Sequence, residues 1–305
     1  MPNLTKISFL EKLTSRYGLL KKLENTKSLF EIGGGGARIY IRYSKVHTRN
    51  QAFYGLRHED LQRLEGFPSI ICFLWDNQKE PLLISFSDYE EVFRSISPTS
   101  DGQYKAMVFL DEATEFYIAG AGRFNVEDRF GFDKLDALID QAKLKPEQDF
   151  SHSQIQTFLS AIGVVKGYDI WIPQNDRSKM DWSLIKKFDF REYLPPEFGQ
   201  IQDILQEIDV IWLERGSNKI RALYEVEHST PIYSGLLRFN DVLLIAPNMK
   251  PRFSIVANDI RRSLFVRQVK RPTFQASGLS ELCTFFEYAN VAGWFNRVQT
   301  QLTQI

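Results

Sequence analysis

Three acidic residues in the second half of the chain have the types and the spacing for metal-ion chemistry. Asp209 stands at the start of one predicted strand, and Glu225 and Glu227 stand near the end of the next. Alternate residues of a strand point to the same face, so Glu225 and Glu227 share a face. If Leu213 pairs with Arg221, Asp209 lies opposite Glu225, whereas a register shift of one residue would turn it to the other face. In the first register, three carboxylates converge at one end of an apolar hairpin.

Such a group of carboxylates needs a cation, because like charges at these distances repel one another. Oxygen ligands suit Mg²⁺, which usually binds to one or two carboxylates and keeps several waters, and we expect Mn²⁺ to substitute for it. A Mg²⁺ ion held in this way can bind a phosphate oxygen, lower the pKa of a water molecule and stabilise a leaving alkoxide. The three acids therefore suit hydrolysis of a phosphodiester. The alternative is an edge hairpin that carries surface ion pairs.

The segments around these acids predict a mixed sheet flanked by helices. Residues 153–163 have the periodicity of an amphipathic helix, and Gly163 ends it. Strands are expected at residues 168–172, 208–213, 220–227 and 252–257. Ser229 or Thr230 caps a helix that runs through Ile245, and a basic helix follows over residues 259–269. Since the first strands can pair as a meander and the later helix crosses to a further strand, the second half is expected to be α/β.

The order Asp209, Glu225-Val226-Glu227, helix and apolar strand resembles the PD-(D/E)xK nuclease superfamily, particularly the type II restriction endonucleases. The resemblance covers about residues 151–275. A Lys normally stands where this chain has Glu227, and a minority of restriction enzymes carry the same Glu-x-Glu variant. The resemblance implies that Asp209, Glu225 and the backbone carbonyl of Val226 bind the metal. It also implies that Glu227 orients or deprotonates the attacking water, or binds a second metal.

This resemblance implies a Mg²⁺-dependent, sequence-specific endonuclease for double-stranded DNA, of the restriction or defence type. Cleavage of both strands commonly uses two active sites, so a homodimer is expected. Because Glu227 replaces the usual Lys, a DNA-binding protein on a catalytically degenerate nuclease fold is the first alternative. A small-molecule enzyme or a protein-interaction scaffold is the second.

Other polar residues near the acids have less specific patterns. His152 precedes the helix predicted over residues 153–163, which carries Gln154 and Gln156. Nuclease folds often have one more acid on a helix here, but this one offers Gln and no Glu, so we interpret the segment as a polar helix start. Glu207 shares a strand face with Asp209 and could join the metal ligands or form a salt bridge. Asp169 and Asp176 are weaker candidates for the same role.

The charges are balanced overall but uneven along the chain. There are 38 Lys and Arg against 38 Asp and Glu, and basic residues concentrate in residues 37–58 and 250–271. This distribution is typical of a protein with a cationic groove, although two solvated basic faces would show it too. The expected DNA contacts are Lys45, Arg49, Arg57, Arg238, Arg261, Arg262 and Arg267.

The 305 residues favour two domains, 1–148 and 149–305, with the boundary in the polar stretch 143–149. Residues 4–28 have helical periodicity, and the rest of the first domain is β-rich (α+β), with strands expected at 37–46, 69–75, 81–85, 105–110 and 115–118. Aromatic neighbours accompany its basic stretch, namely Tyr40, Tyr43, Phe53 and Tyr54. We therefore expect the first domain to recognise DNA.

Composition excludes several classes of protein. A hydrophobic fraction of 43% with 25% charged residues is that of a folded globular chain. Cys72 and Cys283 form neither a disulfide framework nor a zinc ligand set, and Gly33 to Gly36 lacks the Lys-Ser/Thr of a phosphate-binding loop. With no run of about 18 apolar residues and no apolar core near the N-terminus, we expect a cytoplasmic protein without a membrane partner.

Overall fold

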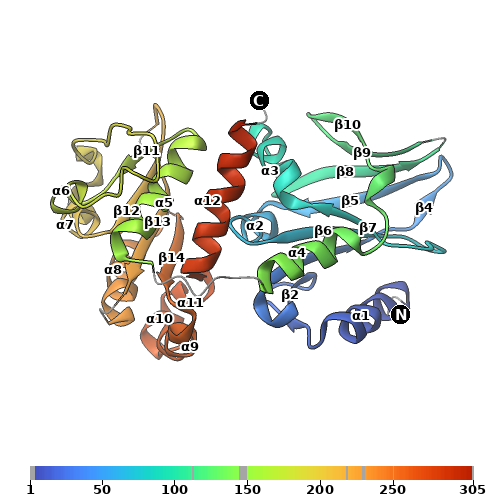
Figure 1. Ribbon diagram of the computed structural model, residues 1–305, viewed down its shortest axis with the longest axis horizontal. Coiled ribbons are helices and arrows are strands. Elements are labelled where there is room, and N and C mark those ends of the chain that lie inside the picture. Colours follow the sequence, from blue (N-terminus) through green and yellow to red (C-terminus); the bar gives the residue numbers. More distant parts are fainter. Residues whose placement is uncertain are drawn as a thin grey trace. The chain divides into compact units, whose positions relative to one another are not determined.

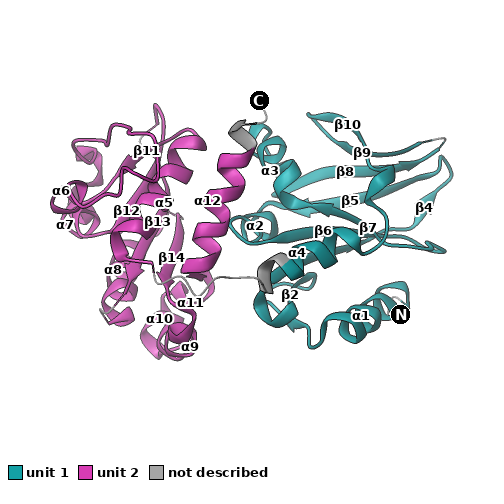
Figure 2. Cartoon of the chain, in the orientation of Figure 1, with its two compact units in different colours: residues 1–145 teal, residues 146–305 magenta. Residues whose placement is uncertain are grey.

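The computed structural model describes residues 4–111, 113–143, 150–217, 219–228, 231–249 and 251–303. The chain forms two compact units, residues 1–145 (unit 1) and 146–305 (unit 2) (Figure 2). The domain boundary predicted between residues 148 and 149 lies outside the described residues, as do the predicted caps Ser229 and Thr230.

Unit 1 contains two five-stranded sheets. The first has the order β1-β2-β3-β6-β7 and is antiparallel except for the parallel pair β3 and β6. Its strands are β1 (Lys21–Lys22), β2 (Leu29–Ile32), β3 (Ala37–Tyr43), β6 (Ser69–Leu74) and β7 (Leu82–Ser85). The second has the order β10-β9-β8-β5-β4 and is antiparallel throughout. Its strands are β4 (Val46–His47), β5 (Gln51–Arg57), β8 (Gln103–Leu110), β9 (Thr114–Ile118) and β10 (Gly122–Asn125).

The core of unit 1 has two parts, one on each face of the first sheet. Tyr40 and Phe73 of this sheet share one cluster of buried residues with Leu56 and Phe116 of the second sheet. The helices α2 (His58–Gln62) and α3 (Phe86–Ser95) also contribute to that cluster. The other cluster joins the first sheet to α1 (Leu4–Tyr17) and α4 (Asp133–Lys143). Along β5 and β8, buried residues alternate with residues that are not buried. One face of the second sheet therefore packs in the core, and the other is its outer face.

Three predictions for unit 1 need correction. The helical periodicity of residues 4–28 gives a helix only over Leu4–Tyr17, and Lys21–Lys22 forms the strand β1. The single strand expected over residues 37–46 is two strands, β3 and β4, and β5 was not among the expected strands. The glycine run, predicted as a flexible connector, forms a 3-10 turn at Gly33–Gly35, with positive φ at all three residues. Glycine is needed there because other residues rarely adopt that conformation.

Unit 2 is built on one mixed sheet of order β11-β12-β13-β14-β15. β12 pairs antiparallel with both β11 and β13, and β14 pairs parallel with both β13 and β15. The strands are β11 (Tyr168–Trp171), β12 (Val210–Glu214), β13 (Ile220–Glu227), β14 (Arg252–Ala257) and β15 (Cys283–Glu287). The mixed sheet flanked by helices is therefore confirmed, and β13 and β14 have the predicted bounds. The edge strand β15 and the helix after it were not predicted.

Helices cover both faces of this sheet (Figure 1). On one face, Trp212 of β12 donates from Nε1 to the carbonyl of Leu159 in α5 (His152–Val165) at 3.1 Å. The centroid of the same indole ring lies 5.6 Å from that of Trp294 in α12 (Tyr288–Thr303). On the other face, Leu236 and Phe239 of α8 (Ile232–Ile245) pack in the main cluster of buried residues. The shorter helices of unit 2 are α6 (Gln174–Arg177), α7 (Gln202–Gln206), α9 (Arg262–Val269), α10 (Pro272–Ala276) and α11 (Leu279–Leu282).

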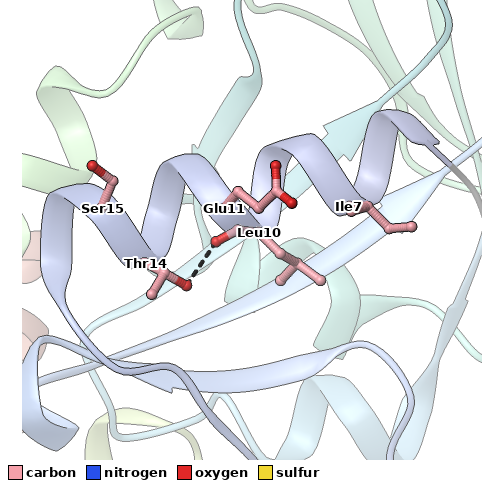
Figure 3. Close-up of a pocket in the computed structure, with 5 residues that line it drawn as sticks. All are labelled: Ile7, Leu10, Glu11, Thr14 and Ser15. Carbon is pink, nitrogen blue, oxygen red and sulfur yellow. Dashed lines mark hydrogen bonds between the residues drawn. The ribbon is translucent and has the colours of Figure 1, made fainter.

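No helix in the described part of the chain has the length and apolar character needed to cross a membrane. An open depression runs along α1, lined by Ile7, Leu10, Glu11, Thr14 and Ser15 (Figure 3). The hydroxyl of Thr14 donates to the carbonyl of Leu10 at 2.9 Å, and Glu11 is the one ionisable group in the lining. The depression therefore offers no pair of groups for acid–base or metal chemistry.

Candidate functional site

The antiparallel hairpin of β12 and β13 sets the positions of the predicted acids. Val210 pairs with Tyr224, and Asp209 directly precedes Val210. Extending the pairing by one residue places Asp209 across from Glu225. The two residues therefore stand at the same end of the sheet, as the expected register requires.

The other end of this hairpin has a different register. Leu213 pairs with Ile220, because the register shifts at a β-bulge between Trp212 and Leu213. The predicted pair of Leu213 with Arg221 is therefore wrong. The bulge takes up one residue on the turn side, and the register beside the acids is the expected one nonetheless.

Asp209 lies at the centre of the site, and its carboxylate is 16% exposed. Its Oδ2 accepts a hydrogen bond from the backbone N–H of Val226 at 2.7 Å. Its Oδ1 lies 3.5 Å from Nε2 of His152. The carboxylate thus contacts both the strand that carries the other acids and the start of α5.

Glu225 is fully buried and is paired with a single arginine. Its Oε1 accepts from Nε of Arg238, and its Oε2 accepts from Nη2 of Arg238, both at 2.7 Å. Burial raises the pKa of Glu225 to about 8, and the hydrogen bonds from Arg238 oppose that shift. The charges of Asp209 and Glu227 are among the causes of this raised pKa, so the three carboxylates interact electrostatically.

Glu227 is also buried, with 1% of its surface exposed, and it lies under α8. A Cβ atom added at Gly235 of α8 would lie 2.8 Å from Oε1 of Glu227 and 3.1 Å from Cβ of Glu225. Both distances are shorter than ordinary carbon contacts. The helix can therefore approach the acidic strand this closely only because Gly235 has no side chain.

The start of α5 places His152 beside Asp209. The hydroxyl of Ser151 accepts from the backbone N–H of Gln154, and the side chain of Gln154 accepts from that of Ser151. This capping box determines where the helix begins, and His152 is its first residue. Burial lowers the pKa of His152, but the hydrogen bond and charge of Asp209, with smaller contributions from Asp176 and the backbone of Val226, raise it overall. The interpretation of His152 as a plain polar helix start is therefore incomplete.

Asp176 of α6 completes a three-residue cluster. One ligand atom each from His152, Asp176 and Asp209 lies within 4.8 Å of the other two. Among the described residues, no other set of three His, Cys, Asp or Glu side chains meets this criterion, so Glu225 and Glu227 do not complete one with Asp209. Two carboxylates and an imidazole are suitable donors for a divalent cation, and the residues present therefore fit one.

The predicted DNA contacts of unit 2 have differing surroundings. The guanidinium of Arg238 is bound to Glu225, and Nη1 of Arg261 donates to the carbonyls of Glu227 and His228 at 2.7 and 3.0 Å. Arg262 pairs with Glu287 at 2.7 Å, whereas Arg267 is exposed. Arg261 and Arg262 thus lie at the end of the sheet that carries Glu227 and Glu287, and both make internal contacts there.

The predicted DNA contacts of unit 1 are all exposed. Lys45 precedes β4, Arg49 lies in the turn after it, and Arg57 ends β5. Phe53 points to the same outer face of the second sheet as Arg57 and is 47% exposed. Of the other aromatic candidates, Tyr40 and Tyr54 are buried in the core of unit 1.

Comparison with known proteins gives the class of this chain. A family model described as the C-terminal domain of the type II restriction enzyme NmeDI matches residues 135–304. The match spans more than half of the chain and includes the whole acidic hairpin. The chain therefore belongs to this family of restriction-enzyme domains.

A particular relative is the type II restriction enzyme NmeDI of Neisseria meningitidis serogroup C. The two are 33% identical over 154 residues, which make up 47% of this chain and 43% of that enzyme. The matched region is thus less than half of the relative's length. No solved structure matches the chain.

Proposed function

We propose that this protein is a type II restriction endonuclease of the PD-(D/E)xK superfamily that hydrolyses phosphodiester bonds in double-stranded DNA. The observation that carries the proposal is the hairpin, which sets Asp209 across from Glu225, with Val226 and Glu227 following on the same strand. Membership in a restriction-enzyme family supports it independently.

The residues of the hairpin have distinct roles in this proposal. Asp209, Glu225 and the carbonyl of Val226 would hold Mg²⁺, or Mn²⁺ in its place, and Glu227 would orient or deprotonate the attacking water. A bound divalent cation lowers the pKa of water and stabilises the charge on the leaving oxygen. The bond from Val226 N–H positions the carboxylate of Asp209, and Arg238 positions that of Glu225. Glu225 and Glu227 are buried away from bulk water, and their electrostatic interactions are stronger there than in water.

Cleavage of plasmid and phage DNA tests this function. The wild-type protein and Glu225→Gln are incubated with methylated and unmethylated DNA, in Mg²⁺ or in EDTA. We expect discrete fragments that require Mg²⁺ and disappear with Glu225→Gln. Glu214→Gln is the matched control, because Glu214 lies at the turn end of the same hairpin and is 38% exposed. Fragments of equal yield from Glu225→Gln would contradict the proposed site.

A second candidate is a DNA-binding protein on a degenerate nuclease fold. Glu227 in place of the usual Lys favours it, as does the engagement of both oxygens of Glu225 by Arg238. In that case neither the wild type nor Glu225→Gln would cut any DNA, and the two would bind DNA with equal affinity.

We further propose that unit 1 recognises DNA through Lys45, Arg49 and Arg57, and that two copies of the chain act together to cut both strands. Changing these three residues to Ala should weaken DNA binding. It should also make the slope of log K against log salt concentration shallower, by up to about 0.9 for each lost phosphate contact. Fluorescence anisotropy at several salt concentrations measures both quantities. A triple variant of the exposed Lys12, Lys22 and Lys134 is the control. Equal losses in the two triple variants would remove the argument for a localised surface.

A further inference from the structure

We propose that His152 and Asp176 join Asp209 in a cation site that prefers a transition metal such as Mn²⁺ or Co²⁺ to Mg²⁺. The inference rests on the proposed function and extends it, since neither residue belongs to the ligand set of Asp209, Glu225 and Val226. The site is formed by three elements of unit 2: the first residue of α5, the helix α6 and the residue before β12.

The distances within this cluster suit a shared cation. Two ligand atoms that each lie about 2.1 Å from a metal are at most about 4.2 Å apart. Nε2 of His152 and Oδ1 of Asp209 are already 3.5 Å apart, and the ligand atom of Asp176 lies within 4.8 Å of both. Only two ligand atoms on opposite sides of the metal reach that limit, and neighbouring ones lie about 3.0–3.4 Å apart, so the carboxylate of Asp176 would have to approach by up to about 1.5 Å to complete the geometry.

A second observation beside the cluster points to a ligand. Gln156, one turn along α5 from His152, is 0% exposed. Its Nε2 donates to Oδ2 of Asp176 at 3.3 Å and to the carbonyl of Asp209 at 3.2 Å, so the amide lies against the cluster. Its Oε1 is buried and has no hydrogen-bond partner among the described residues. A buried acceptor without a donor is costly, and a hydrated cation would bring donors to this place.

The surroundings of Asp176 leave it able to bind a cation. Its only ion pair in the described part of the chain is with Lys179, at 2.8 Å, and the side chain of Lys179 is 60% exposed. A pair this exposed contributes little stability, so Lys179 can move away at small cost. Asp209, in contrast, is held by Val226 and can serve as the fixed ligand.

The imidazole determines which metals this site prefers. Mg²⁺ is bound mainly by oxygen, whereas imidazole nitrogen suits the later first-row metals, whose affinity for such ligands rises from Mn²⁺ to Co²⁺. A site of one imidazole and two carboxylates should therefore bind Mn²⁺ and Co²⁺ more tightly than Mg²⁺. The ligand set of Asp209, Glu225 and Val226 contains oxygen alone, which suits both Mg²⁺ and Mn²⁺, so its preference should be smaller.

Metal titration without DNA tests the inference. Mn²⁺ binding is followed by the electron paramagnetic resonance signal of the free ion, and Mg²⁺ binding by its competition with Mn²⁺. We expect His152→Gln and Asp176→Asn each to weaken Mn²⁺ binding at least about tenfold. We also expect His152→Gln to remove most of the preference for Mn²⁺ over Mg²⁺. His47→Gln and Asp169→Asn are the matched controls, since both residues lie outside the cluster.

The outcomes separate this inference from the proposed nuclease function. Unchanged Mn²⁺ affinity in both variants would overturn the inference, even if the protein cuts DNA. Loss of Mn²⁺ binding in both variants would support the inference, even if no DNA is cut. Circular dichroism spectra identical to that of the wild type ensure that a loss of binding reflects a lost ligand rather than unfolding.

Discussion

Asp209→Asn should abolish metal-dependent DNA cleavage while leaving the fold intact. Asp209 is the one acid shared by the hairpin site and the cluster with His152, so the substitution weakens both. Metal stabilisation of a transition state is worth several kcal/mol, and each 1.36 kcal/mol is about a factor of ten in rate. We therefore expect a loss of at least about a hundredfold in the single-turnover cleavage rate.

The fold should survive this change, because the amide oxygen of Asn can still accept the hydrogen bond from Val226. A melting temperature within a few degrees of the wild type is the expected result. Asp169→Asn makes the same chemical change on β11, where Asp169 pairs with Arg191 and Arg215, and should cleave normally. A cleavage rate for Asp209→Asn within about threefold of that of Asp169→Asn would show that Asp209 does not bind the catalytic metal.

At a pH above 8, where Glu225 of the folded protein is ionised, Arg238→Met should lower the free energy of unfolding by about 3–5 kcal/mol, because it leaves the carboxylate of Glu225 buried without its partner. Urea denaturation without divalent cations measures this loss. The double variant with Glu225→Gln should recover part of it, since an amide carries no charge. Arg267→Met, on the exposed face of α9, is the control and should change stability little. A loss of less than about 1 kcal/mol for Arg238→Met would contradict a structural role for the pair.

The same pair predicts a pH dependence. In the folded protein the pKa of Glu225 is raised from 4.5 to about 8, so the folded state holds a proton that the unfolded chain has released. The contribution of Glu225 is therefore fully present below pH 4.5 and is lost as pH rises toward 8. Arg238→Met removes the group that opposes the raised pKa of Glu225, so the stability should continue to fall to higher pH. The free energy of unfolding of Arg238→Met, relative to that of the double variant with Glu225→Gln, should therefore decrease as pH rises. The slope is at most about 1.4 kcal/mol per pH unit. A difference that does not vary with pH would show that Glu225 keeps the same protonation state in both folded and unfolded chains.

The acidic hairpin could be predicted because its signals are local. Apolar residues, a turn with Gly216 and two acids at alternate positions determine strand bounds and side-chain faces without knowledge of the rest of the chain. The edge strand β15 was missed for a related reason. A five-residue segment with two adjacent phenylalanines has no clear period, and periodicity alone does not separate such a strand from a helix.

The partners of the acids could not be predicted, because they come from helices that are brought to the hairpin by packing on the sheet. Arg238 reaches Glu225 from α8, and His152 reaches Asp209 across 57 positions of the chain. Only packing of helices on the sheet brings these groups together. Asp176 was a weak candidate from sequence because α6, which carries it, is a four-residue helix with no pattern of its own.

The β-bulge between Trp212 and Leu213 has a consequence for how the turn at residues 214–219 can change. The hairpin already accommodates one extra residue on the turn side while the pairing of Val210 with Tyr224 is kept. A peptide inserted into this turn should therefore alter its length without sliding the two strands past one another. The turn is thus a permissive attachment point, where a fluorophore or an affinity tag could be carried on the same hairpin as the acids while their alignment is preserved.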